Sequence, residues 1–231
     1  MTPPFRQLPL DLPHAESRSR ADFLESCSNA QALAMIDAWP DWPARTLALI
    51  GPQGAGKSHL GAVLAERAGA ATIPAAMLRT DGVPEALATG ALVLEDLDAA
   101  PFDEAALFHL LNLAGEQRAF LLITARHAPA ALADRLATRD LASRLRALPT
   151  ASIGAPDDAL LAAVTLKLFA DRQIVPDDAL LAFLLARVER SVAAMRETVA
   201  ALDREALARK RAPSRALAAE LLRAQGDDAE G

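Results

Sequence analysis

Tyrosine is absent from this chain of 231 residues, and aromatic residues make up only 4% of it. The hydrophobic content of 52% therefore comes mainly from Leu, Ala, Val and Ile, of which Ala and Leu favour helices. That content is ample for a packed core, and the length allows one large domain or a medium domain with a small companion. We predict a globular protein with much helix.

The chain also has fewer basic than acidic residues, which gives a formal net charge of −6. Binding to DNA or RNA rests on clustered Lys and Arg, so direct sequence-specific contact with nucleic acid is not expected. The single cysteine, Cys27, cannot form an internal disulfide, which suits a reducing cytoplasm. No apolar run reaches the ~18 residues of a membrane span, and Pro3, Pro4 and Arg6 interrupt the segment where a signal peptide would lie. We therefore expect a cytoplasmic protein with no membrane contact.

The motif around which the chain is organised is GPQGAGKS at residues 51–58, which fits the phosphate-binding P-loop pattern. It follows an apolar run at 46–50, typical of a buried strand, and precedes helical spacing at 59–66. Backbone N–H groups of such a loop and of the new helix bind phosphate, while Lys57 would reach the outer phosphates and Ser58 would hold magnesium. An accidental glycine-rich turn is the alternative, and a chance match is roughly a 1% event. The expected nucleotide-binding residues are Gly51, Gln53, Gly54, Ala55, Gly56, Lys57, Ser58 and His59.

Two further apolar runs end in polar residues. ALVLED at residues 91–96 ends in Glu95 and Asp96, which would serve a magnesium ion and polarise the attacking water, or else cap the next helix. The order of these two acids leaves open which takes which role. AFLLIT at 119–124 predicts a second buried strand that places Thr124 at the edge where parallel sheets present ligands. Thr124 would sense a nucleotide there, or be an ordinary β-branched strand residue.

The alternation of strands and helices stops at about residue 156. The heptapeptide PDDALLA occurs at 156–162 and again at 176–182, and each copy predicts a helix start with an Asp cap and an acidic first turn. Two more helices are expected at about 192–210 and 214–223. We therefore predict four parts, namely a flexible tail at 1–20, a nucleotide-binding αβα domain at 21–155, a small helical domain at 156–226 and a disordered acidic tail at 227–231.

Two segments have the character of interaction sites. In QLPLDL at residues 7–12, leucines alternate with other residues, as in an extended peptide that docks into an apolar groove. Packing of these leucines on the chain's own domain is the alternative. Residues 135–146 hold four arginines, which form a solvated helical face or supply an arginine that projects into a neighbouring subunit's nucleotide site.

Together these motifs resemble the AAA+ family, and more narrowly the Hda proteins, relatives of the replication initiator DnaA that lack its DNA-binding domain. The resemblance extends from Gln7 to about Leu222. It identifies 51–58 as the Walker A loop and 92–96 as the Walker B strand. It also assigns a sliding-clamp-binding peptide (Gln7, Leu8, Leu10, Leu12), a sensor 1 residue (Thr124), a trans arginine finger (Arg144, in the segment 140–145) and a sensor 2 arginine (Arg196).

The resemblance implies an AAA+ P-loop core, with a parallel sheet flanked by helices, and a small all-α lid. It implies ADP or ATP with magnesium as cofactors, and the sliding clamp (the β subunit of DNA polymerase III) and DnaA as partners; it leaves homodimerisation open. The implied function is negative regulation of replication initiation, by stimulating ATP hydrolysis on DnaA. Glu95 and Asp96 invert the usual acid order, which puts this chain's own ATPase activity in question. The alternatives are an autonomous AAA+ ATPase, such as a helicase loader or remodelling motor, and a small-metabolite kinase.

Overall fold

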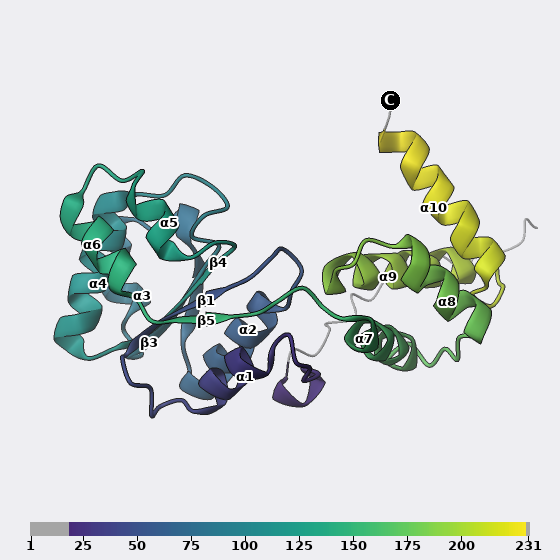
Figure 1. The fold of residues 1–231 in the computed structure, drawn as a ribbon, viewed down its shortest axis with the longest axis horizontal. Coiled ribbons are helices and arrows are strands. Elements are labelled where there is room, and N and C mark those ends of the chain that lie inside the picture. Colours follow the sequence, from purple (N-terminus) through teal and green to yellow (C-terminus); the bar gives the residue numbers. More distant parts are fainter. Residues whose placement is uncertain (1–18, 230–231) are drawn as a thin grey trace, which may run out of the picture.

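The computed structural model describes residues 19–229, with side chains described as far as residue 224. The predicted clamp-binding peptide at 7–12 lies outside this range. The chain forms an α/β part and a group of C-terminal helices beside it, joined by the strand after α6 and the loop that follows (Figure 1). Among the described residues, no helix is long and apolar enough to cross a membrane.

The α/β part is built on a five-stranded parallel sheet. Its strands are β1 (Thr46–Ile50), β2 (Ala71–Pro74), β3 (Ala91–Glu95), β4 (Phe120–Ala125) and β5 (Thr150–Ser152), in the order β2-β3-β4-β1-β5. The apolar runs of β3 and β4 are buried almost throughout, as expected for strands covered on both faces. Because all the pairings are parallel, the carboxyl ends of β1, β3 and β4 meet at one edge.

Helices cover both faces of this sheet (Figure 1). The helices are α1 (Ala30–Asp37), α2 (Lys57–Ala68), α3 (Val83–Ala86), α4 (Glu104–Gln117), α5 (Pro129–Ala133) and α6 (Arg139–Ala147). Successive strand residues face opposite sides, so Val93 packs in the core shared with α1 and α2, while Leu92 and Leu94 pack in the core shared with α3, α4 and α6. This arrangement confirms the predicted α/β class.

The C-terminal helices have a hydrophobic core of their own. They are α7 (Asp158–Ala170), α8 (Asp178–Arg187), α9 (Val192–Ala208) and α10 (Arg215–Ala229), and they enclose buried side chains that include Phe169, Leu184 and Leu202. The repeated heptapeptide starts α7 and α8 as predicted, because Asp157 and Asp177 each accept a hydrogen bond from a backbone N–H of the first turn.

Both predicted tail boundaries differ from the structure. The helix α10 extends to Ala229, so three of the five residues expected in a disordered acidic tail have helical backbone. Ala and Gln at 224 and 225 favour continuation of the helix. At the other end, Ser19 and Arg20 belong to the folded part, although the flexible tail was predicted to include residue 20.

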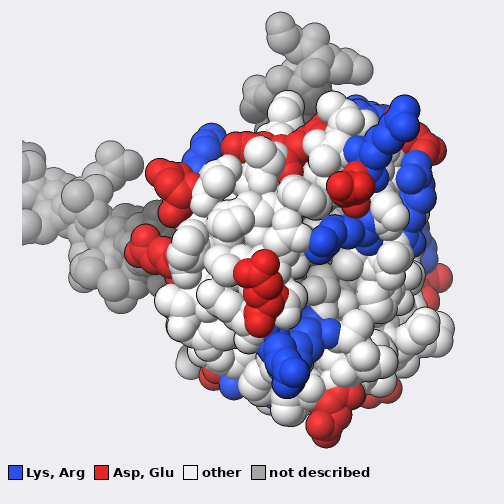
Figure 2. Space-filling model, turned by 90° about the vertical axis from the view of Figure 1, so that its left-hand side faces the viewer, with Lys and Arg blue, Asp and Glu red and all other residues white. Residues whose placement is uncertain are grey.

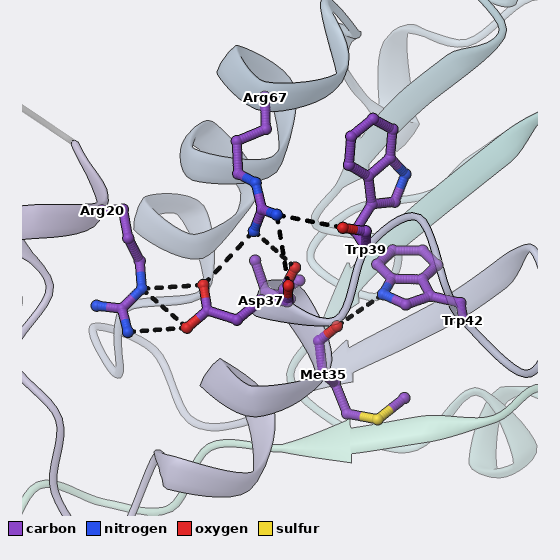
Figure 3. A network of polar contacts seen from close by, with 7 residues as sticks. Arg20, Met35, Asp37, Trp39, Trp42 and Arg67 are labelled. Carbon is purple, nitrogen blue, oxygen red and sulfur yellow. Dashed lines mark hydrogen bonds and ion pairs between the residues drawn. The ribbon is translucent and has the colours of Figure 1, made fainter.

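A polar network fastens this N-terminal segment to the α/β part (Figure 3). The Arg20 guanidinium donates to both carboxylate oxygens of Asp37 on α1, at 2.8–3.0 Å. Arg67 of α2 also reaches Asp37 at 3.5 Å and donates to the backbone carbonyls of Ile36, Asp37 and Trp39. At the start of α2, where the candidate site lies, Nε2 of His59 is 2.9 Å from the carbonyl oxygen of Ser19 in the same segment.

Candidate functional site

The P-loop connects β1 to α2 in a conformation that needs glycine, as Gly56 and Gly51 show. Gly56, directly before α2, has φ of 105°, and a Cβ there would stand 3.1 Å from the ring of Phe23. A Cβ on Gly51 would stand 2.4 Å from the carbonyl oxygen of Ile153, closer than any real contact. The loop is therefore packed against the residue that follows β5 and against the N-terminal segment, and the backbone N–H groups at the start of α2 are available to an anion.

Lys57, the first residue of α2, is buried and turns back onto the loop. Its Nζ donates to the carbonyl oxygens of Gly51 at 2.8 Å and Pro52 at 2.9 Å. Burial lowers the pKa of Lys57, and the neighbouring Asp96 and Asp98 oppose that shift. A buried ammonium whose hydrogen-bond partners are carbonyl oxygens would be stabilised by a phosphate beside it.

A cavity of about 330 Å³ lies between the P-loop and the C-terminal helices. Its P-loop wall contains Gln53 to His59, and Asp96 and Arg196 line it from the sheet edge and from α9. Four of the predicted site residues do not line it, namely Gly51, Glu95, Thr124 and Arg144.

The two acids at the end of β3, Glu95 within the strand and Asp96 directly after it, face different ways. Asp96 is exposed to the cavity, whereas Glu95 is half-buried against the second turn of α2, with Oε1 3.7 Å from where a Cβ on Gly61 would stand. Among the described residues no three His, Cys, Asp or Glu side chains gather as a metal cluster. Magnesium at nucleotide sites is held by one or two carboxylates together with phosphates, and the Ser58 hydroxyl and Asp96 fit that donor set.

Thr124 has a structural partner. It is fully buried, and its hydroxyl oxygen accepts a hydrogen bond from the backbone N–H of Asp96 at 3.0 Å. Its carbonyl oxygen accepts from the N–H of Leu97 at 2.9 Å. Thr124 therefore orients Asp96 from the neighbouring strand and does not itself reach the cavity.

Three walls of the cavity were not predicted from the sequence. The N-terminal segment contributes Asp22, Phe23 and Leu24, the end of β4 contributes Arg126, and α7 contributes Leu160, Val164, Lys167, Leu168 and Asp171. The cavity residues of α7 are spaced three or four apart, which places them on one face of the helix. This spacing is the sequence signal that could have predicted them. No local signal marks the N-terminal segment, because only the fold brings it to the P-loop.

An ion pair closes this side of the cavity. Nζ of Lys167 lies 2.9 Å from Asp22 of the N-terminal segment and 2.8 Å from Asp171, which follows the last residue of α7. Burial would lower the pKa of Lys167, but hydrogen bonds to Asp171 and Asp22 raise it overall. On the other side of the segment, Phe23 makes an edge-on contact with His59, whose Nε2 lies 2.9 Å from the Ser19 carbonyl oxygen.

Solved structures with a similar arrangement include DnaA and RuvB proteins. Domain III of the Thermotoga maritima replication initiation protein DnaA has a TM-score of 0.74 at 17% identity, over 89% of this chain and 95% of that one. AMPPCP-bound DnaA from Aquifex aeolicus has a TM-score of 0.61 at 15% identity, over 78% and 63%. The Thermotoga maritima Holliday junction branch migration motor RuvB has a TM-score of 0.66 at 16% identity, over 90% and 72%. No protein-family model and no curated protein matches the chain.

The chain has the AAA+ fold. In this fold the α/β part is the AAA+ core and α7–α10 form the small helical lid. The cavity thus lies between core and lid, with residues 22–24 along one side.

Arg144 lies elsewhere on the AAA+ core. It is exposed on α6, with its guanidinium 5.3 Å from the centre of the Phe108 ring on α4. The face that carries α4 and α6 has basic side chains gathered along one edge, with acidic ones around them (Figure 2). Arg144 does not line its own chain's cavity.

Proposed function

We propose that this protein is an Hda-type negative regulator of DNA replication initiation. It binds an adenine nucleotide in the cavity between core and lid, attaches to the sliding clamp through residues 7–12, and inserts Arg144 into the nucleotide site of DnaA. The inserted guanidinium stabilises the charge that develops on the phosphates and so accelerates hydrolysis of the ATP held by DnaA.

One observation carries this proposal: Arg144 is exposed on α6 and lies outside the cavity of its own chain. This position supports a role in completing the site of another molecule. The match to DnaA domain III over 95% of that chain supports DnaA as the partner, because similar folds can pack side by side in the same manner.

The cavity residues support a bound adenine nucleotide as a structural cofactor. Lys57 and Arg196 would hold the phosphates, and Ser58 and Asp96 would hold magnesium, which shields the phosphate charge. Since these residues come from core and lid, occupation of the cavity would set the angle at which the two parts meet. The AMPPCP-bound DnaA structure supports an adenine nucleotide as the ligand.

The test is ATP hydrolysis by purified DnaA, with this protein and a DNA-loaded clamp. We expect stimulation that disappears with Arg144→Ala, because such an arginine contributes about 10³ to 10⁵ in rate. Arg139→Ala is the matched control, since it removes an exposed arginine from the same helix. Unchanged stimulation by Arg144→Ala would refute the role of this arginine.

The clamp assignment needs its own test, because residues 7–12 lie outside the described structure. We expect the double variant Leu10→Ala, Leu12→Ala to lose clamp binding while it keeps nucleotide binding, since the peptide is separate in sequence from the P-loop. Retained clamp binding would show that another surface meets the clamp.

The exposed position of Arg144 also favours a second candidate, an autonomous AAA+ ATPase in which Arg144 completes the site of an identical neighbour. Hydrolysis by this chain alone would then rise steeply with its concentration and would fall with Arg144→Ala in the absence of DnaA. The two candidates therefore differ in which protein's ATP is hydrolysed.

A further inference from the structure

Arg126 occupies a central position at the edge of the sheet where the candidate nucleotide site lies. It directly follows β4, and β4 lies between β1, which leads into the P-loop, and β3, which leads into Asp96. Ile50 pairs with Ala125 in the register, and the N–H of Gly51 donates to the Ala125 carbonyl oxygen at 3.2 Å. Arg126 is therefore level with the start of the P-loop.

The side chain of Arg126 faces the same space as Lys57. Both line the cavity, together with Ser58 and Asp96. Burial lowers the pKa of Lys57, the carboxylates of Asp96 and Asp98 oppose that shift, and the positive charge of Arg126 adds to it. Among the residues whose side chains are described, the Arg126 guanidinium has no hydrogen-bond or ion-pair partner. Two cations that repel each other across a cavity are stabilised by an anion between them.

The backbone at Arg126 is held by a buried carboxylate. The side chain of Asp98, only 3% exposed, accepts hydrogen bonds from the N–H of Arg126 at 2.7 Å and from the N–H of His127 at 2.9 Å. Nδ1 of His127 lies 2.8 Å from the same carboxylate. The guanidinium therefore projects from a fixed point, which limits the entropy lost when it binds a ligand.

We propose that Arg126 is a phosphate-binding residue of this cavity, which contacts the outermost phosphate of a nucleoside triphosphate and makes the site discriminate tri- from diphosphate. Asp98 is the positioning residue that holds it there. Thr124, the residue expected to sense the nucleotide, is buried and bonded to Asp96, and Arg126 takes that function two residues later. The inference rests on the proposed nucleotide site and not on the proposed contact with DnaA.

The experiment measures dissociation constants of the full-length protein for AMPPCP, ADP and AMP in magnesium buffer, by titration calorimetry. Arg126→Ala should weaken AMPPCP binding about 10- to 100-fold, the range for a hydrogen bond between charged groups, and ADP less. AMP binding should not change, because AMP does not reach the outer site. Arg135→Ala removes the same charge from an exposed position outside the cavity and should change none of the three constants.

Further measurements distinguish a failure of this inference from a general loss of structure and from a failure of the proposed function. Asp98→Asn should lose part of the discrimination between AMPPCP and ADP while AMP affinity stays the same, which a general loss of structure would not produce. Equal AMPPCP affinity in Arg126→Ala and the unsubstituted protein, with weakened binding in Lys57→Ala, would overturn the inference alone. Equal loss of all three ligands in Arg126→Ala would also overturn it, by showing a structural role. Failure to stimulate DnaA would refute the proposed function and leave the discrimination by Arg126 standing.

Discussion

Adding one methyl group at Gly51 should destabilise this protein for a purely steric reason. The Cβ of Gly51→Ala would stand 2.4 Å from the carbonyl oxygen of Ile153 and 3.3 Å from two of its carbon atoms. That carbonyl belongs to backbone beside β1, where the N–H of Ile153 donates to Ile50 at 2.7 Å, so it cannot move aside as a side chain would. Overpacking of this kind costs about 1 to 3 kcal/mol of the free energy of unfolding.

The same substitution at Gly115 provides a control of opposite sign. Gly115 lies in α4, is exposed, and has no atom within 4 Å of an added Cβ. Alanine there gains helix propensity of about 0.5 to 1 kcal/mol. Because 1 kcal/mol shifts Tm by roughly 2 to 4 °C at this chain length, Gly51→Ala should lower Tm by about 2 to 12 °C and Gly115→Ala should raise it by about 1 to 4 °C.

The assay is thermal unfolding followed by circular dichroism at 222 nm, with nucleotide affinity measured at 25 °C on the same samples. Gly51→Ala should also weaken nucleotide binding, because the carbonyl oxygen of Gly51 is one of the two partners of Lys57. A Tm equal to that of the unsubstituted protein, with unchanged nucleotide affinity, would show that the contact with Ile153 does not hold the P-loop as argued.

Three further outcomes are expected. Burial would raise the pKa of Asp98, but hydrogen bonds from the backbone N–H groups of Arg126 and His127, and from the His127 side chain, lower it overall. The ionised carboxylate therefore stabilises the folded protein above pH ~4, and this contribution is lost as the pH falls through the lower pKa of the folded state. In an acid titration of the free energy of unfolding, Asp98→Asn should lack this part of the decrease in stability. Asp177→Ala removes the cap of α8 and should cost about 1 kcal/mol in urea unfolding, and no change would mean that the cap is replaced by water. Phe169→Ala leaves a cavity at a fully buried position of the lid and should lower the free energy of unfolding by about 3 to 5 kcal/mol. Amide hydrogen exchange in this variant should be faster in α7–α10 than in the sheet, and equal exchange in both would contradict a separate core in the lid.

Much of the local structure was predictable because its causes are local. The P-loop pattern, the buried apolar runs and the two Asp-capped helix starts each depend on a few adjacent residues, and all of them form as expected. Ends of elements were less accurate, since α10 continues past the predicted end at 223. Ends depend on capping and pairing with distant segments, which a local pattern does not contain.

A P-loop, two acids and a threonine at the ends of the neighbouring strands, and the helices that follow were all predictable from the order of the residues. Which of these side chains meet depends on the tertiary structure. It turned Thr124 toward Asp96 and away from the cavity, brought residues 22–24 and one face of α7 against the P-loop, and placed Arg126 beside Lys57. The physical reason is that strand order and the packing of core against lid involve residues far apart in the chain, whose contacts are selected by the burial of whole faces and not by any short pattern.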